Sequence, residues 1–220
     1  MSAEELEVEM EPGSFSTVFS RALQGHPCSV VGLSERPQPL PVGDWTRPAD
    51  ASDDLLLDEC VGPTIDVGCG PGRLSARLVE LGHVVLGIDV VHEAVEQTRQ
   101  RGVSAIVRDV YDTLPGEGRW RTALLADGNI GIGGDPVALL TRVGELLDPR
   151  GRVVVEVAGP GAGLQTGWAA LECSRTRSRP FRWSIVGADA IHEVADEAGL
   201  AVTDVRRGLE RWCAVLEKAA

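Results

Sequence analysis

The chain has 220 residues, of which 33 are acidic and 21 basic, giving a formal net charge of -12. With 43% hydrophobic and 25% charged residues, its composition is that of a folded protein, neither disordered nor collagen-like. The acidic balance argues against a nucleic-acid partner, and no apolar run approaches the roughly 20 residues that cross a bilayer. Because the first residues also resemble no export signal, we expect a cytoplasmic protein without nucleic-acid or membrane partners.

The cysteines and histidines show no metal-binding spacing. The 5 cysteines are odd in number and form no CxxC pair, and the 4 histidines are equally scattered. We therefore predict no metal, no zinc site and no disulfide framework, and expect buried free thiols. The cysteines are Cys28, Cys60, Cys69, Cys173 and Cys213.

The N-terminal quarter divides into a tail and a connector. Residues 1–12 are rich in glutamate and predict an acidic flexible tail, and residues 13–60 predict a lid or connector. Within it, Phe15, Val18 and Leu23 recur at helical spacing, whereas prolines make residues 33–53 an extended connector. A short helix is expected over residues 53–59, capped by Ser52 or Asp53.

From residue 61 to residue 220 strands and helices alternate, which predicts one further domain. Near-continuous apolar strands separated by helices are typical of a parallel sheet covered on both faces, so the fold class is α/β, Rossmann-like and doubly wound. Asp135 and Pro136 predict the cap and first position of one helix. The expected strands cover 64–70, 83–89, 103–109, 122–128, 152–159, 200–207 and 211–218, and the expected helices 72–82, 92–102, 137–147 and 188–199.

The turn after the first of these strands carries the chemistry. It reads DVGCGPG, with glycines at Gly68, Gly70 and Gly72 following Asp66. Glycines let a backbone approach a ligand closely, and ligands of open α/β sheets bind beyond the carboxyl ends of the strands. The spacing is not the GxGxxG of a pyrophosphate site, and no P-loop lysine follows. A carboxylate beside the turn suits a cationic ligand better than a phosphate.

Acidic residues also end the next three strands. They are Asp89, Asp109 and Asp127, the last followed by Gly128 and Asn129. One such acid is ordinary at a strand end, but four on successive strands together with the glycine turn indicate a common crevice.

These motifs resemble class I S-adenosylmethionine-dependent methyltransferases, from about residue 62 to the C-terminus. DVGCGPG resembles that family's first motif, GID its second, and RDV and LLADGN the positions after the third and fourth strands. The resemblance implies a seven-stranded sheet of order 3-2-1-4-5-7-6 with the seventh strand antiparallel, an N-terminal helical cover, and S-adenosylmethionine as cofactor.

The resemblance also implies roles for individual residues. Asp66 and the glycine turn, which includes Cys69, would contact the methionine moiety. Asp89 would hold the ribose, and Val90 is also expected to bind the cofactor. Asp109 and Val110 would bind the adenine, and Asp127 or Gly128 would line the sulfonium side.

The sequence offers several candidates for the residues that contact the methyl acceptor. Asn129 and Trp183 are candidate substrate contacts, and Glu156 and His26 are candidates for a general base. Glu156 stands in an apolar strand, where it either faces the cleft or pairs with a buried arginine. Four arginines in residues 175–182 either hold an anionic acceptor or form a solvated edge.

We expect methyl transfer to a small-molecule acceptor by a monomer or homodimer. Two alternatives remain at this stage: a non-catalytic scaffold or sensor that binds the same cofactor, and an NAD-dependent oxidoreductase. The second is disfavoured by the glycine spacing.

Overall fold

The computed structural model describes residues 11–218, so the predicted acidic tail falls almost wholly outside the described residues. Its larger sheet has seven strands in the order β12-β13-β8-β7-β4-β5-β6. The strands are β4 (Thr64–Val67), β5 (Val85–Asp89), β6 (Ser104–Val107), β7 (Trp120–Leu125), β8 (Leu147–Val157), β12 (Leu200–Arg207) and β13 (Trp212–Lys218).

The predicted strand order is confirmed. Numbered along the chain within this sheet, the order from β6 to β12 is 3-2-1-4-5-7-6. β13 pairs antiparallel with β8 and with β12, whereas β4, β5, β6, β7 and β8 pair in parallel. The fold class is therefore the doubly wound α/β class that the alternation of apolar strands and helices predicted.

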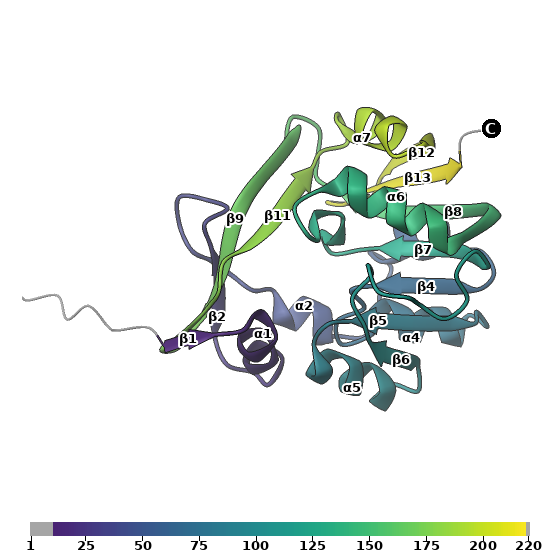
Figure 1. Cartoon of the computed structure of the whole chain (residues 1–220). Coiled ribbons are helices and arrows are strands. Elements are labelled where there is room, and N and C mark those ends of the chain that lie inside the picture. The colour runs from purple at the N-terminus through teal and green to yellow at the C-terminus, as the bar shows by residue number, and fades with distance from the viewer. Residues whose placement is uncertain (1–10, 219–220) are drawn as a thin grey trace, which may run out of the picture.

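Helices cover both faces of this sheet (Figure 1). Leu125 faces a core shared with α6 (Pro136–Leu146) and α7 (Ile191–Glu197), whereas its neighbour Leu124 faces a core shared with α3 (Asp54–Leu57) and α4 (Arg73–Glu80). Successive strand residues point to opposite faces, so the continuous apolar run of β7 fills two cores at once. Helix α5 (His92–Gln100) packs beside β5 and β6.

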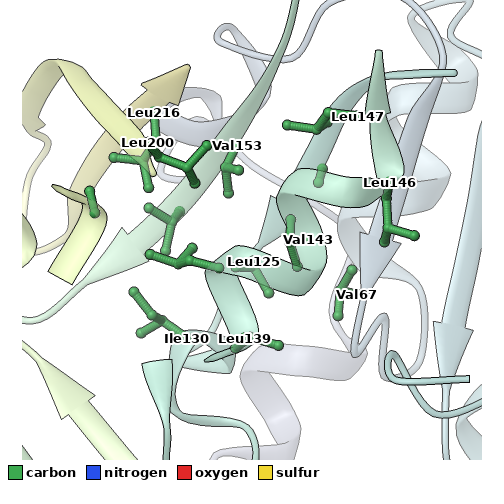
Figure 2. Close-up of a cluster of buried hydrophobic side chains, with 14 of the residues drawn as sticks. Val67, Leu125, Ile130, Leu139, Val143, Leu146, Leu147, Val153, Leu200 and Leu216 are labelled. Carbon is green, nitrogen blue, oxygen red and sulfur yellow. The ribbon is translucent and has the colours of Figure 1, made fainter. Parts of the chain in front are cut away.

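Helix α6 shows how the sequence sets these cores. Its Leu139, Val143 and Leu146 recur at helical spacing and lie fully buried against Leu125 and Val153 (Figure 2). Asp135 accepts a hydrogen bond from the Ala138 amide at 3.0 Å, and proline occupies the first turn. The predicted cap is confirmed.

A second, smaller sheet was not predicted. It joins β1 (Glu11–Gly13), β10 (Thr176–Ser178), β9 (Leu164–Cys173), β2 (Cys28–Val31) and β3 (Gln38–Pro39), with β11 (Phe181–Val186) paired to β9. Helices α1 (Phe15–Leu23) and α2 (Val42–Thr46) accompany it. We call these elements together the cover. Figure 1 shows β9 and β11 rising away from the larger sheet, beside β2.

The predicted helical cover is thus only part of the cover. Helix α1 forms as expected, with Ser14 accepting from the Thr17 amide at 3.0 Å. The connector, however, contains α2 and β3, and the stretch expected to be irregular supplies β9. β9 reads LQTGWAALEC, and its glycine and paired alanines hide the alternation that identifies a strand.

The prediction that every cysteine is a free thiol was wrong for one pair. Cys28 and Cys173 lie directly opposite each other on β2 and β9 and form a disulfide. Their separation of 145 residues gives the sequence no local sign of the pairing. Cys60, Cys69 and Cys213 are free and buried.

No helix within residues 11–218 combines the length and apolar character needed to span a bilayer.

Candidate functional site

A cavity of about 590 Å³ opens between the carboxyl ends of β4 to β7 and the cover. All four predicted strand-end acids line it, so the crevice expected from the sequence exists. The predicted residues that line the cavity are Asp66, Gly68, Cys69, Gly70, Asp89, Val90, Asp109, Val110, Asp127, Asn129 and Trp183.

The glycine turn has a backbone that side chains would disturb. Gly68, Gly70 and Gly72 have φ values of 72°, 54° and 79°, in the left-handed region. A Cβ on Gly68 would lie 2.7 Å from the Asn129 amide nitrogen, and one on Gly72 would lie 2.6 Å from the Thr98 hydroxyl. The turn therefore requires glycine for conformation and for close packing.

Three side chains hold this turn in place. Asn129 Nδ2 donates to the carbonyls of Val67 and Gly68, at 3.0 and 2.9 Å. Thr98 Oγ1 donates to the Gly70 carbonyl at 2.8 Å, and Asp89 Oδ2 accepts from the Gly70 amide at 3.0 Å. Asn129, predicted to contact substrate, thus uses its amide nitrogen to support the turn.

Asp66 is a carboxyl group buried beneath the turn. It is 2% exposed, and Oδ2 accepts a hydrogen bond of 2.6 Å from the Ser75 hydroxyl. Burial raises the pKa of Asp66 to about 7, although the Ser75 hydrogen bond opposes the shift. A cationic ligand would favour the ionised form, so this carboxyl suits an ammonium or sulfonium group.

The next two acids mark neighbouring strand ends. Asp89, the last residue of β5, also accepts from the Val91 amide at 2.8 Å, and burial raises its pKa above the ordinary value. Asp109 follows β6 and is exposed, and it accepts from the Tyr111 amide at 3.0 Å. Both carboxylates retain lone pairs that can accept ligand hydroxyl or amino groups.

Asp127 adopts a left-handed backbone with φ of 52°, which is unusual for a residue other than glycine. Both its carboxylate oxygens accept from Arg73 Nη2 at 2.9 Å, and Arg211 lies 3.2 Å away. Burial raises the pKa of Asp127, and the Arg73 charge opposes that shift.

Residues 65–151 match the family model of a methyltransferase domain. The chain is 37% identical over 65 residues to a tabtoxin biosynthesis enzyme of Pseudomonas amygdali pv. tabaci, a match that covers 30% of this chain and 26% of that protein. It is 28% identical over 129 residues to a ubiquinone biosynthesis O-methyltransferase of Bordetella bronchiseptica, covering 58% and 48%. The chain thus spans about half, or less, of the curated relatives it matches.

Solved structures share the fold. A SAM-dependent methyltransferase from Bacteroides fragilis, in complex with S-adenosyl-L-homocysteine, superposes with a TM-score of 0.78 at 19% identity, covering 93% of this chain and 94% of that one. A 1,6-didemethyltoxoflavin-N1-methyltransferase of Burkholderia thailandensis gives a TM-score of 0.58 at 21% identity, covering 80% and 81%. These matches support the resemblance to class I S-adenosylmethionine-dependent methyltransferases, whose fold the chain shares. The family resemblance found in the sequence is confirmed.

The two candidates for a general base, His26 and Glu156, do not line the cavity. His26 is exposed in the turn after α1. Glu156 is bound by Arg211 through two hydrogen bonds of 2.7 Å, which is the arginine-paired alternative. Gly72 and Gly128 also lie outside the lining; Gly72 precedes α4, and Gly128 precedes the 3-10 turn at Asn129–Gly131.

The sequence did not reveal an ion-pair cluster beside the cavity. Asp53, predicted as a helix cap, makes no cap hydrogen bond and is fully buried. It contacts Arg73, and also Arg47 at 2.9 Å and Arg211 at 2.6 Å. Burial alone would raise its pKa, but the Arg73 hydrogen bond and charge outweigh it and lower the pKa of Asp53 to about 2. The cluster joins three segments, residues 47–53, Arg73 and Arg211, so no local sequence pattern predicts it.

Proposed function

We propose that this chain transfers the methyl group of S-adenosylmethionine to a small-molecule acceptor. The observation that carries the proposal is that the glycine turn and the four strand-end aspartates border one cavity, which continues beneath the cover. That continuity leaves room for a cofactor on the sheet side and an acceptor on the cover side. The shared fold and the methyltransferase domain match support the same function.

The residues on the sheet side fit this cofactor. Asp66, whose pKa is raised to about 7, gains most from a cationic ligand, and a pyrophosphate would be repelled by it. The left-handed glycines leave a concave backbone that a Cβ would fill. These two observations favour a sulfonium nucleoside over NAD, so an oxidoreductase is disfavoured.

We assign the cofactor contacts as the family resemblance implies. Asp66 and the turn through Gly68 and Gly70 would bind the methionine portion. Asp89 would accept the ribose hydroxyls, and Val90 would contact the cofactor beside it. Asp109 with Val110 would bind the adenine, and the Asp127–Gly128 segment would line the sulfonium side.

When bound, S-adenosylmethionine supplies a methyl carbon on positive sulfur; the acceptor's electron pair forms the new bond to carbon while the carbon–sulfur pair goes to sulfur. The chain contributes alignment and a water-poor cavity. Because the methyl group is already activated, proximity can supply much of the rate enhancement. The hydrogen bonds that Asn129 and Thr98 donate to the turn, and the one that Asp89 accepts from it, keep that alignment rigid.

Isothermal titration with S-adenosylhomocysteine and with NAD tests the cofactor assignment. We expect binding of S-adenosylhomocysteine and none of NAD; the reverse result would overturn the proposal. Incubation with radiolabelled S-adenosylmethionine and a lysate metabolite pool then tests transfer. Cofactor binding without transfer to any metabolite would support the scaffold or sensor instead.

A further inference from the structure

The cover side of the cavity is lined by a continuous chain of aromatic rings. Along it, Trp45 contacts Phe19 at 5.5 Å between centroids, Phe19 contacts Phe15 at 5.4 Å, Phe15 contacts Phe181 at 5.0 Å, and Phe181 contacts Trp183 at 6.2 Å. All five rings line the cavity. We call this chain of rings the aromatic wall.

The aromatic wall gathers most of the few aromatic side chains of this protein at one place. Aromatic side chains make up 4% of the sequence, yet the wall contains all 3 phenylalanines and two of the 5 tryptophans. Each of the five is only partly buried, so the rings do not simply fill a core. The wall is also assembled from three separate places, α1, α2 and β11. Ring faces and edges at such spacings favour a planar partner that stacks or packs edge to face.

Apart from Arg182 of β11, whose guanidinium carbon lies 5.8 Å from the centroid of the Trp168 ring, the rest of the cover side is mostly apolar. Val30 of β2 and Leu171 of β9 line it, together with Leu33, Leu40 and Ile132. An aliphatic and aromatic lining of this kind disfavours a highly charged or sugar-like acceptor, whose polar groups would lose water without new partners.

The described residues that line the cavity include no histidine, lysine, tyrosine or glutamate. Asp66 lies beneath the turn, Asp127 is paired with Arg73, and Asp89 already accepts two backbone amides. Asp109 is assigned to the adenine. Cys69 is buried, which raises the pKa of its thiol well above the ordinary value.

Building on the proposed function, we infer that the acceptor is a planar aromatic or heteroaromatic molecule whose nucleophilic atom needs no enzyme base. Such an atom is a ring nitrogen with a free electron pair, or a ring hydroxyl acidic enough to be ionised near neutral pH. Its electron pair forms the bond to the methyl carbon and the sulfur takes the electrons of the broken bond. An ionised oxygen then becomes a neutral ether, and a ring nitrogen becomes a cation or releases its own proton to water. An aliphatic alcohol would first have to lose a proton to a base.

Two matched pairs of probes test this inference. For shape, binding of 2-naphthol and of its saturated analogue decahydro-2-naphthol is measured calorimetrically on the protein saturated with S-adenosylhomocysteine. We expect 2-naphthol to bind at least about 10-fold more tightly, because stacking adds to simple area burial. Equal affinity would overturn the role of the wall.

For chemistry, transfer is measured across acidic phenols and ring nitrogens, with 4-nitrophenol against 4-nitrobenzyl alcohol as the matched pair. Because general-base catalysis is worth about 100-fold or more, we expect the alcohol to react at least about 100-fold more slowly. The rate with 4-nitrophenol should rise with its ionised fraction to a plateau. Comparable rates for the alcohol, or no transfer to any acidic phenol or ring nitrogen, would overturn the inference.

Variants separate this inference from the proposed function. Phe19→Leu should weaken 2-naphthol binding several-fold while S-adenosylhomocysteine still binds. The control is Trp168→Leu, since Trp168 is 61% exposed and lies outside the cavity lining; it should leave 2-naphthol binding unchanged. Failure of S-adenosylhomocysteine itself to bind would refute the proposed function. Normal cofactor binding with no preference for flat probes would refute only the aromatic acceptor.

Discussion

Arg211 and Glu156 form a two-bond ion pair: Nε donates to Oε1 and Nη2 donates to Oε2, each at 2.7 Å. Glu156 Oε2 also accepts from the backbone amide of Asp127 at 2.6 Å. Arg211 lies in the turn between β12 and β13, far along the chain from the strand end that it supports. One side chain of the last hairpin therefore fixes the segment that borders the cavity.

Replacing this arginine should destabilise the whole domain. Arg211→Met removes the arginine partner of Glu156 and one of the three arginine partners of Asp53 in a mostly buried place, and we expect a loss of about 3 kcal/mol in the free energy of unfolding. Urea denaturation measures it. The control is Arg177→Met, whose pair with Glu172 is largely exposed and should matter by less than about 0.5 kcal/mol. Equal losses of unfolding free energy in both variants would show that the buried ion-pair cluster stabilises the fold no more than an exposed ion pair does.

The ribose assignment is tested at Asp89. Asp89→Asn keeps the shape of the side chain but removes its charge, and charged hydrogen bonds contribute about 1.5–3 kcal/mol. We therefore expect the dissociation constant for S-adenosylhomocysteine to rise by about 10- to 100-fold in calorimetric titration. Asp196→Asn, a change on the exposed side of α7, is the matched control. An unchanged affinity would mean that Asp89 does not hold the nucleoside.

Cofactor binding should release a proton near neutral pH. The pKa of Asp66 is raised to about 7 in the folded protein, so below that pH the carboxyl is mostly protonated. A cationic ligand favours the ionised form, so affinity for S-adenosylmethionine should rise as the pH increases from 6 to 8. Titrations in phosphate and in Tris would show the release as a buffer-dependent enthalpy. Asp66→Asn should abolish that dependence, and its persistence would point to another group.

The same carboxyl predicts the pH dependence of the ligand-free protein. Its folded pKa lies above the unfolded value, so ionisation opposes folding, and its contribution to stability falls as the pH rises through about 4 to 7. Asp53 has the opposite sign: its pKa of about 2 lies below the unfolded value, so its contribution is lost as the pH falls from about 4 to 2. Unfolding midpoints of Asp66→Asn and Asp53→Asn across pH separate the two.

A pair of glycine substitutions distinguishes backbone strain from crowding. Gly68→Ala places a Cβ 2.7 Å from Asn129 Nδ2 at a φ of +72°, whereas Gly82→Ala has a similar φ of +88° with nothing within 4 Å. Gly82→Ala should lower the free energy of unfolding only by the cost of a left-handed backbone at alanine, about 1–2 kcal/mol. Gly68→Ala should cost more, and should also weaken S-adenosylhomocysteine binding because Asn129 must move. Identical stability and affinity in the two variants would show that the turn tolerates a side chain.

The disulfide between Cys28 and Cys173 can be tested by counting reactive thiols. In denaturant without reductant, three of the five cysteines should react, and all five should react after reduction. Cys28→Ser with Cys173→Ser should lower the free energy of unfolding by about 2–4 kcal/mol, and the variant should be insensitive to reductant. Five reactive thiols in the oxidised protein would rule the bridge out.

The larger sheet was predictable because its signals are local. A pattern of a few residues is enough to predict apolar strands such as VVVEV, the helix cap at Asp135 and the glycine turn. The order of the strands came from family resemblance, and the acids at strand ends converge because parallel strands share one edge.

The cover and the ion-pair cluster depend on contacts between distant segments. β9 pairs with β2 across more than half the chain, and Asp53 gathers arginines from α4 and from the last hairpin. In the sequence, nothing distinguishes the buried Asp53 from an aspartate in an exposed turn, or Thr98 from an ordinary threonine in a helix. Such residues are identified only when the fold brings their partners to them.

The cover has a practical consequence for dissecting this protein. Its small sheet interleaves a segment before the first strand of the larger sheet with a segment inserted near its end, joined by β1 to β10 and by β2 to β9. A shortened chain starting at residue 61 would therefore deprive β9 of β2, remove Phe15, Phe19 and Trp45, and expose the two remaining rings of the aromatic wall to water. Changing the acceptor specificity would require substitutions in both segments together. The glycine turn and the strand-end acids of the larger sheet could stay unchanged.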